Sequence, residues 1–148
     1  CGGSIITQRH ILTAAHCFEI TDYSYHVIVG EFDRTEIEPN EQQISFTIKD
    51  VISHSKYNRV TDENDIAIIW LRVTIQLTAY AQPICLPAKS LQYKDKLNCV
   101  ISGWGKTWDN DFADSAITLM AARVLTLRYQ DCREPASYGN KIKDSMFC

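Results

Sequence analysis

The sequence predicts an all-β protein, an antiparallel barrel or sandwich made of many short strands. Two observations lead to this fold class. Apolar residues either alternate with polar ones or gather in short β-branched and aromatic runs, and turn residues separate these runs. Sustained helical periodicity is rare along the chain. Hydrophobic residues make up 45% of the sequence and charged residues 22%, which is enough apolar material for a folded core.

Individual elements follow from these patterns. Between Ile44 and Ile48 every second residue is apolar, so these residues share one face of a strand. Further strands are expected where β-branched and aromatic residues cluster or where an apolar run has strand length: Tyr25 to Phe32, Asp65 to Leu71, Leu97 to Ser102 and Leu119 to Leu127. Helix is expected only in two short pieces, Thr13 to Cys17 and Tyr129 to Ser137.

Length and charge narrow the class of protein. A chain of 148 residues suits one domain or two small ones. The net charge of −3 gives no reason to expect a nucleic-acid partner, because nucleic-acid-binding proteins carry basic patches. The longest uninterrupted apolar run, Ile66 to Leu71, is far shorter than the roughly 20 residues that cross a bilayer. We therefore expect no membrane span.

The cysteines and the chain ends suggest a secreted protein. Six cysteines in 148 residues favour an oxidising, extracellular compartment. The sequence begins at Cys1 without an initiator Met or a signal peptide, and it ends at Cys148. We therefore expect either a mature product or a piece of a longer secreted chain.

A change in composition near residues 80–97 suggests a connector between two structural units. Pro83 and Pro87 flank Cys85 in this stretch. Proline interrupts the hydrogen-bond ladder of a sheet, so a regular strand is not expected there.

Two residues are candidate catalytic groups. His16 lies among small residues in Thr13-Ala14-Ala15-His16-Cys17, and an imidazole held rigidly in this way suits a general base. Asp65 leads directly into a run that must be buried, where a carboxylate needs a donor such as an imidazole N–H. On these residues alone, His16 is equally consistent with a helix cap, and Asp65 with a loop charge like its neighbours Asp62 and Glu63.

Four motifs in order resemble the trypsin/chymotrypsin family of serine endopeptidases: Cys1-Gly2-Gly3-Ser4, Thr13-Ala14-Ala15-His16-Cys17, Asp65-Ile66-Ala67 and Gly103-Trp104-Gly105. The resemblance implies two antiparallel Greek-key β-barrels with the active site between them. Residues 1–83 would form a nearly complete first barrel, 84–97 the interbarrel connector and 98–148 an incomplete second barrel. His16 would be the general base and later the general acid, and Asp65 would orient its ring.

The family's nucleophile is missing from this sequence. It is a serine in a Gly-Asp-Ser-Gly-Gly segment, and none of the ten serines here lies in such a segment. The family's Ile-Val-Gly-Gly start is also absent, and the residues lining the specificity pocket are expected beyond Cys148. We therefore expect a fragment of a proteolytic enzyme, inactive alone, whose partners are polypeptide substrates and protease inhibitors. The alternative is a secreted, catalytically dead homologue that acts as a binding or regulatory module.

Six cysteines allow 15 pairings. The resemblance implies two of them, Cys1 with Cys17 and Cys132 with Cys148. It also implies that Cys99 pairs with a cysteine in a missing C-terminal part, and that Cys85 bonds a light chain or propeptide. The alternative is that Cys85 and Cys99, which are close in the sequence, pair with each other.

Five acidic residues lie close together in the sequence, with Arg34 as the only basic residue among them: Glu31, Asp33, Glu36, Glu38 and Glu41. These carboxylates repel one another unless they are solvated or bridged by a cation such as Ca²⁺. The stretch resembles the calcium loop of trypsins, which implies side-chain ligands from the three residues Glu31, Glu38 and Glu41 and backbone carbonyls from the other two acidic residues. The alternative is an exposed acidic loop without an ion. No cofactor is expected to be needed for catalysis.

Overall fold

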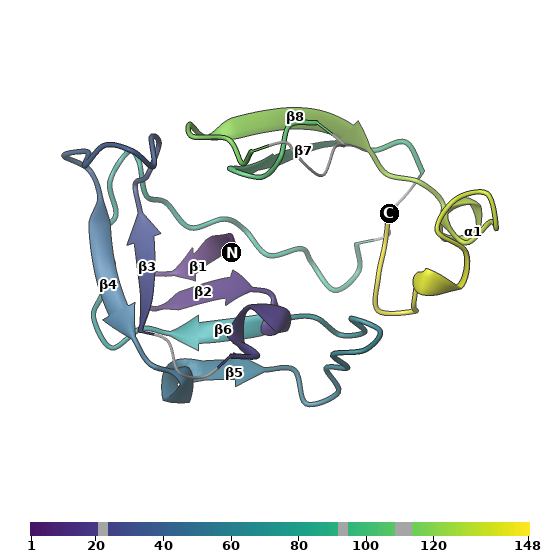
Figure 1. Ribbon diagram of the computed structural model, residues 1–148, viewed down its shortest axis with the longest axis horizontal. Coiled ribbons are helices and arrows are strands. Elements are labelled where there is room, and N and C mark those ends of the chain that lie inside the picture. The colour runs from purple at the N-terminus through teal and green to yellow at the C-terminus, as the bar shows by residue number, and fades with distance from the viewer. Residues whose placement is uncertain (21–23, 92–94, 109–113) are drawn as a thin grey trace.

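The computed structural model describes residues 1–20, 24–91, 95–108 and 114–148. The molecule is mostly strand with little helix, as the sequence predicted (Figure 1). Its described strands form one four-stranded antiparallel sheet with the order β1-β2-β6-β5 and two antiparallel pairs, β3-β4 and β7-β8. No described helix is long and apolar enough to cross a membrane.

The strands of the three sheets are β1 (Gly3–Thr7), β2 (His10–Thr13), β3 (Tyr25–Val29), β4 (Gln42–Phe46), β5 (Val51–Ser53), β6 (Ala67–Trp70), β7 (Asn98–Gly103) and β8 (Met120–Leu125). The helical pieces are the 3₁₀ turns η1 (Ala15–Phe18), η2 (Ile48–Asp50) and η3 (Gly139–Lys141), and the one-turn helix α1 (Tyr129–Cys132).

The five strands expected from the sequence are all present, but most are shorter than expected. The strand that was expected to run to Ile48 ends at Phe46, because Thr47 and Asp50 form a reciprocal capping box that starts η2. The Thr47 N–H and hydroxyl both donate to Asp50 Oδ2, at 3.0 and 2.8 Å. The expected helix from Tyr129 to Ser137 ends at Cys132.

Strands β1, β2 and β5 were not expected from the sequence. They are three to five residues long, and their few apolar residues do not stand in a longer apolar or alternating run. The pairing register instead explains them. His10 of β2 pairs with Trp70 of β6, and Val51 of β5 pairs with Ile69 of β6. The apolar strand β6 therefore has a hydrogen-bonded neighbour on each side.

The hydrophobic core lies between the four-stranded sheet and the β3-β4 pair. Its buried residues come from both sheets and from the segment after β6: Ile11, Val29, Ile44, Phe46, Ile69, Leu71, Ile75 and Ala81. An aromatic cluster of Phe18, Tyr25 and Phe46 closes one end, with ring centroids 5.4 to 6.1 Å apart. This core therefore forms entirely within the first 81 residues.

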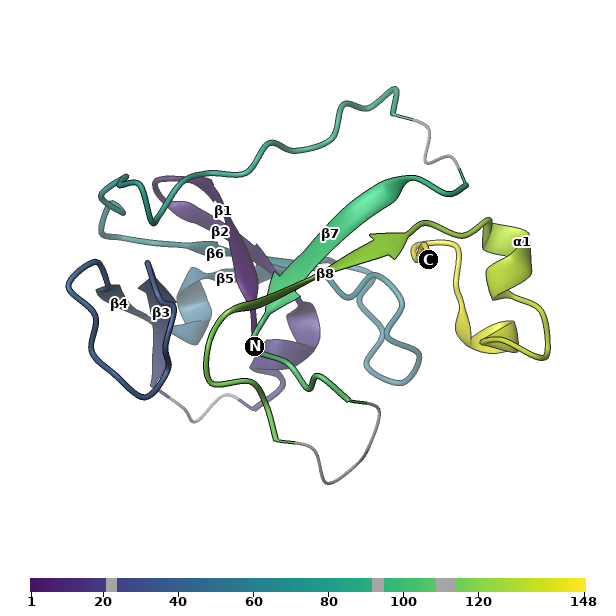
Figure 2. The ribbon, with the colours of Figure 1, turned by 90° about the horizontal axis from the view of Figure 1, so that it is seen from above.

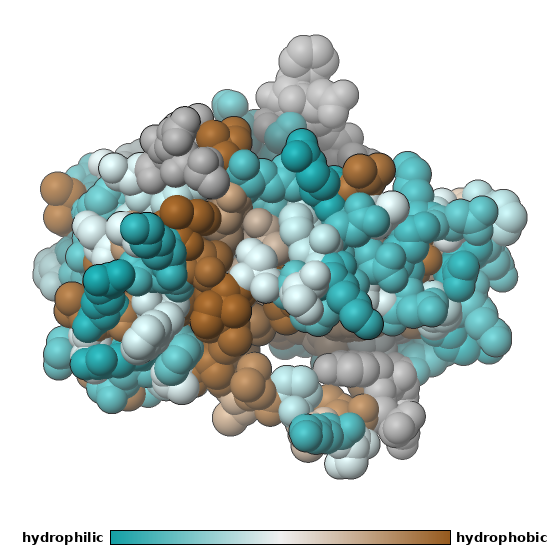
Figure 3. All heavy atoms as spheres, turned by 90° about the horizontal axis from the view of Figure 1, so that it is seen from below, coloured by the Kyte–Doolittle hydropathy of each residue, from teal (hydrophilic) through white to brown (hydrophobic). Residues whose placement is uncertain are grey.

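The β7-β8 pair lies above the four-stranded sheet in Figure 1 and crosses over it in Figure 2. All six residues of β8 are exposed. Seen from below, a band of hydrophobic side chains runs between hydrophilic parts of the surface (Figure 3). The described parts of the connector, residues 84–91 and 95–97, contain no helix or strand, and positions 92–94 lie outside the described residues. The division into units at 83/84 and 97/98 stays a prediction.

Replacing Leu71 by Ala should lower the free energy of unfolding by about 2–5 kcal/mol, because it removes a large buried side chain and leaves a cavity. Leu71 is fully buried, at 0% exposure. Val73→Ala is the matched control, since Val73 is 60% exposed and should change stability by less than about 0.5 kcal/mol. Urea unfolding measures both, and equal losses in the two variants would contradict this placement of the core.

Candidate functional site

Strand pairing brings His16 and Asp65 together from distant parts of the sequence. Thr13, the last residue of β2, pairs with Ala67, the first residue of β6. Because the two strands are antiparallel, the residues that follow Thr13 and those that precede Ala67 meet at the same edge of the sheet. The 3₁₀ turn η1 then places His16 beside Asp65.

Asp65 contacts His16 twice. Its Oδ1 accepts the His16 backbone N–H at 2.9 Å, and its Oδ2 lies 2.7 Å from the ring Nδ1. The carboxylate accepts, so the proton of the neutral ring is assigned to Nδ1, which leaves the Nε2 lone pair free. Burial tends to raise the pKa of Asp65, but the hydrogen bonds from the His16 ring and backbone outweigh it and hold that pKa below its usual value.

The turn before Asp65 is fixed from two sides. Asn64 has a positive φ of 58°, which asparagine tolerates better than most residues. Its side-chain amide donates to the carbonyl of Lys56 at 3.0 Å, and its backbone N–H donates to the hydroxyl of Ser145 at 3.0 Å. Ser145 carries no signal in the sequence, because nothing in the pattern near the C-terminus shows that it reaches this turn.

Tyr57 is a second residue that the sequence did not place near this site. Its hydroxyl donates to Glu19 Oε1 at 2.7 Å. That hydrogen bond, burial and the charges of Glu19, Asp65 and Asp62 raise the pKa of Tyr57 to about 12. The rim of the site is therefore acidic, and Tyr57 remains a neutral donor there at physiological pH.

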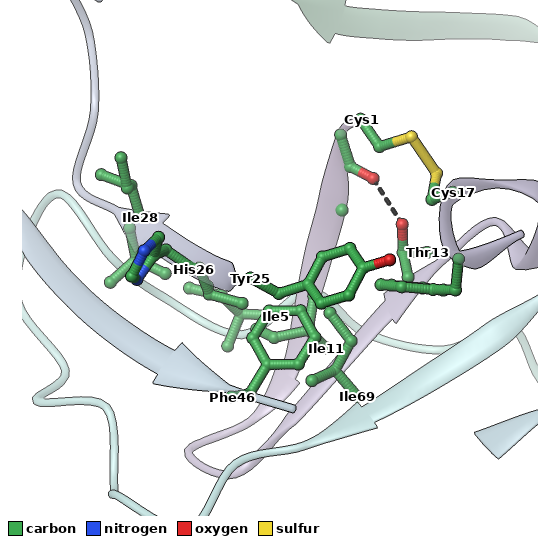
Figure 4. A pocket seen from close by; sticks show the side chains of 15 residues that line it. Cys1, Ile5, Ile11, Thr13, Cys17, Tyr25, His26, Ile28, Phe46 and Ile69 are labelled. Carbon is green, nitrogen blue, oxygen red and sulfur yellow. Dashed lines mark hydrogen bonds between the residues drawn. A yellow bond between two sulfur atoms is a disulfide. The ribbon is translucent and has the colours of Figure 1, made fainter. Parts of the chain in front are cut away.

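The Cys1–Cys17 disulfide fastens β1 to the turn that carries His16, with the two Cα atoms 6.2 Å apart. Figure 4 shows this bond at the edge of a pocket, together with the hydrogen bond from the Thr13 hydroxyl to the carbonyl of Gly2, which measures 2.7 Å. The pocket has a volume of about 260 Å³ and is lined largely by apolar side chains of the two core-forming sheets.

Of the other four cysteines, two are bonded to each other and two are free thiols. Cys132 and Cys148 form the second disulfide that the resemblance implied. Cys85 is an exposed thiol and Cys99 a partly buried one, so they are not bonded to each other in this structure.

The acidic stretch between β3 and β4 brings three of its five carboxylates together. Carboxylate oxygens of Glu31, Glu38 and Glu41 all lie within 4.8 Å of one another. Glu38 Oε2 accepts the N–H of Phe32 at 2.6 Å, and Glu41 Oε1 accepts the N–H of Glu38 at 2.9 Å. These bonds hold the carboxylates in place although their charges repel.

Glu31 is the member of this cluster whose charge is least compensated. Its Oε1 is buried and lacks a hydrogen-bond partner among the described residues. Burial and the charges of Glu41 and Glu38 raise the pKa of Glu31. An oxygen atom with these properties fits a cation ligand, because a bound cation would compensate both the burial and the repulsion.

Asp33 and Glu36 do not add their carboxylates to the cluster. Asp33 Oδ1 accepts the hydroxyl and N–H of Thr35, at 2.6 and 2.9 Å, and these bonds lower the pKa of Asp33. The Asp33 carbonyl accepts the N–H of Glu36 at 3.1 Å, and the Glu36 side chain is exposed. Their expected part as carbonyl ligands stays a prediction.

Gly30 is required at the start of this loop. Its φ is +79°, and a Cβ atom there would lie 2.2 Å from the carbonyl oxygen of Asn40. A residue with a side chain would therefore push the two ends of the loop apart and separate the three carboxylates.

Comparison with known proteins finds similarity over the whole chain. The family model described as Trypsin matches residues 1–148. The chain is 32% identical to chymotrypsin-C of Mus musculus and 37% identical to chymotrypsin-C of Rattus norvegicus, in each case over all of this chain and 54% of the relative. It is 38% identical to ovochymase of Halocynthia roretzi over 74% of this chain and 7% of that protein. The chain thus spans about half the length of the chymotrypsin-C relatives.

Acid should destabilise the native chain more strongly than it destabilises the Asp65→Asn variant. The pKa of Asp65 is lowered by folding, so the unfolded chain binds the extra proton as the pH falls through the usual Asp value of about 3.9. The stability that ionised Asp65 contributes is present above that pH and is lost below it. Asn cannot titrate, so its variant should show a flatter dependence of stability on pH.

Urea unfolding at a series of acidic pH values measures this difference. Asp62→Asn is the control, because the exposed Asp62 side chain lies near Asp65 in the sequence but is not the partner of His16. The interpretation fails if the two variants lose stability in parallel with the native chain.

Proposed function

Because this chain belongs to the trypsin family of serine proteases, we propose that the protein containing it is a serine endopeptidase that uses His16 and Asp65. The observation that supports this most is the pair of Asp65 contacts to His16, which fixes the ring and leaves Nε2 available. This arrangement is what a general base needs in peptide-bond hydrolysis through an acyl-enzyme.

The chemistry proposed for the two residues follows from their geometry. His16 Nε2 would accept the proton of a serine hydroxyl as that oxygen attacks the substrate carbonyl, and it would then deliver the proton to the leaving amine. Asp65 would hold the ring in the Nδ1–H form and stabilise the imidazolium that forms between these steps. The serine is expected in a Gly-Asp-Ser-Gly-Gly segment that is absent from these 148 residues.

The proposed architecture completes this site with a second unit. Residues 1–83 would form the first Greek-key barrel, 84–97 the connector and 98–148 the beginning of the second barrel. The location of the core within the first 81 residues supports this division, and so does the exposed β7-β8 pair, whose apolar residues include Val100 and Ile101. The missing half of the relatives' length would supply the rest of the second barrel.

Compartment and partners are part of the same proposal. Two disulfides support a secreted protein, since such bonds persist in oxidising compartments. Polypeptides would be its substrates, and protease inhibitors its further partners. The exposed thiol of Cys85 is suitably placed to bond a light chain or propeptide.

The activity is tested on two forms of the protein. The 148-residue chain alone should not hydrolyse a chromogenic peptide, because it has no activated serine. In a form that continues past Cys148 and carries the serine segment, Asp65→Asn should lower kcat by roughly 10⁴-fold, because the amide would hold the imidazole in the wrong tautomer. His16→Ala should lower it at least as much, and Asp62→Asn, the exposed neighbour, should have little effect.

Labelling by a serine-reactive phosphonate reports the nucleophile separately from turnover. If the 148-residue chain hydrolysed the peptide and the reagent blocked this turnover, the proposal that the serine lies outside these 148 residues would be contradicted. A longer form with Gly in place of the serine, and no labelling, would instead support the alternative of a catalytically dead binding module.

We also propose that the acidic loop between β3 and β4 binds a structural Ca²⁺ ion. Glu31, Glu38 and Glu41 would supply carboxylate oxygens, and Asp33 and Glu36 backbone carbonyls. The buried, unpartnered Oε1 of Glu31 supports this, because Ca²⁺ is bound by six to eight such oxygens. The ion would stabilise the loop and take no part in the chemical step.

Glu31→Gln should have opposite effects with and without Ca²⁺. Without the ion it should stabilise the chain, since it removes a charge that is repelled by Glu38 and Glu41. Binding of Ca²⁺ should raise the free energy of unfolding of the native chain by about 2.7 kcal/mol at a Ca²⁺ concentration of 100 times Kd. Glu31→Gln should abolish this rise. Glu36→Gln is the control, because its exposed side chain should contribute no ligand.

Calorimetric titration and thermal unfolding with and without Ca²⁺ measure these effects. The native chain and Glu36→Gln should bind one ion each. If the native protein binds no Ca²⁺, the loop is an acidic turn without an ion. If Glu31→Gln binds Ca²⁺ as well as Glu36→Gln does, Glu31 is not a ligand.

A further inference from the structure

We propose that reduction of the Cys1–Cys17 disulfide turns this corner into a binding site for one thiophilic divalent cation such as Zn²⁺. The ligands would be the two cysteine thiolates and His16 Nε2, with water in the fourth position. Imidazole and thiolate together are a ligand set that zinc prefers.

The distances to the ring support this site. His16 Nε2 lies 3.9 Å from Cys1 Sγ and 3.8 Å from Cys17 Sγ, so it faces both sulfur atoms (the disulfide itself appears in Figure 4). In a tetrahedral zinc site, with Zn–S about 2.3 Å and Zn–N about 2.0–2.1 Å, a nitrogen and a sulfur ligand are about 3.6 Å apart. The nitrogen therefore needs little movement. Once the S–S bond is broken, the two sulfurs are free to separate to the ~3.8 Å of such a site.

Asp65 already provides the outer contact that a zinc-binding histidine requires. Histidine ligands of metals commonly donate their other ring N–H to a carboxylate, which fixes the tautomer and makes the metal-binding nitrogen more basic. His16 Nδ1 lies 2.7 Å from Asp65 Oδ2, and the opposite nitrogen, Nε2, faces the sulfurs. The Asp65 contact therefore orients the His16 ring for metal binding in the same way as for proton transfer.

The corner keeps its shape through contacts other than the disulfide. Gly3 pairs with Thr13 in the β1-β2 ladder, and the Thr13 hydroxyl donates to the carbonyl of Gly2 at 2.7 Å. On the other side, Asp65 accepts the backbone N–H of His16. Cys1 is exposed and the His16 side chain is 54% exposed, so a reductant and a cation can reach them.

The chemistry balances with a dithiol as the reductant. The dithiol is oxidised to its own disulfide while the Cys1–Cys17 bond is reduced to two thiols. The cation then binds the two thiolates and releases one proton from each thiol to the solvent. The oxidation state of the metal does not change. Reoxidation by a disulfide reverses the first step and releases the cation.

The consequence for catalysis rests on the proposed function. A cation on Nε2 would occupy the lone pair that must accept the serine proton, so reductant and zinc together would inhibit the enzyme. Metal binding itself is measured without any turnover, so a failure of this proposal and a failure of the proposed function are distinguishable.

Cobalt(II) is the probe, because thiolate ligands give it charge-transfer absorption and a tetrahedral site gives it strong visible bands. The chain with Cys85→Ser and Cys99→Ser is reduced with dithiothreitol, freed of it by anaerobic gel filtration and titrated. We expect one Co²⁺ per reduced chain, displaced by one Zn²⁺, and no such absorption from the oxidised chain.

Four variants in that background locate the site. Replacing both Cys132 and Cys148 by Ser should leave the absorption unchanged, because no described histidine accompanies that disulfide in a potential metal cluster. Replacing both Cys1 and Cys17 by Ser should abolish it. His16→Ala, which keeps all the thiols, should weaken binding at least 10-fold, and Asp65→Asn should weaken it by about 10–100-fold, the usual effect of losing such an outer contact.

Several results would overturn the proposal. One is absorption that survives in the variant without Cys1 and Cys17, and another is equal affinity in the native and His16→Ala chains. A third is loss of the near-ultraviolet circular dichroism of the fold on reduction, because the site needs the β1-β2 pairing to hold its ligands.

Discussion

The pairing of β2 with β6 is the constraint on which the rest of the site depends. These strands lie at the centre of the four-stranded sheet, and their apolar residues Ile11 and Ile69 face each other in the register and are buried in the core. A shift of the register by one residue would turn these side chains away from the core, so the hydrophobic effect fixes the alignment. The same alignment determines which residues meet just beyond the strand ends, and those residues are His16 and Asp65. Stability and the candidate chemistry therefore have a common origin.

Three structural features meet where Cys1, Cys17, His16 and Asp65 lie together. The Asp65 carboxylate orients the His16 ring, the Cys1–Cys17 disulfide joins the first strand to the turn that carries this ring, and the Asp65 backbone leads into β6. Much of the His16 side chain is exposed, whereas Asp65 is largely covered, with side-chain exposures of 54% and 21%. The hydrogen bonds from His16 keep the partly buried Asp65 ionised, and the exposed ring can reach a substrate, which is the combination that a proton-transferring pair requires.

The sequence predicted the elements that carry a local signal and missed those that depend on distant contacts. The strand around Val27 and the run into Leu71 have patterns that show their burial directly. No such signal marks Asp50, although its side chain is buried at 5% exposure and accepts a hydrogen bond from Arg72 Nε at 2.8 Å. Tyr57 and Ser145 likewise reach the site only through the fold. The family resemblance named His16 and Asp65, but their distances are a property of the sheet register.

The acidic loop connects the first sheets to the β7-β8 pair as well as holding three carboxylates. The Phe32 carbonyl accepts both the N–H of Leu119 at 2.9 Å and the indole N–H of Trp104 at 3.1 Å, and the Arg34 N–H donates to the carbonyl of Ile117 at 3.1 Å. The repulsion within the cluster therefore acts on a segment that also positions the turn after β7 and the start of β8. All six residues of β8 are exposed and none belongs to the buried core cluster, so these hydrogen bonds help to orient the strand. The loop that brings Glu31, Glu38 and Glu41 together therefore also helps to orient β7 and β8.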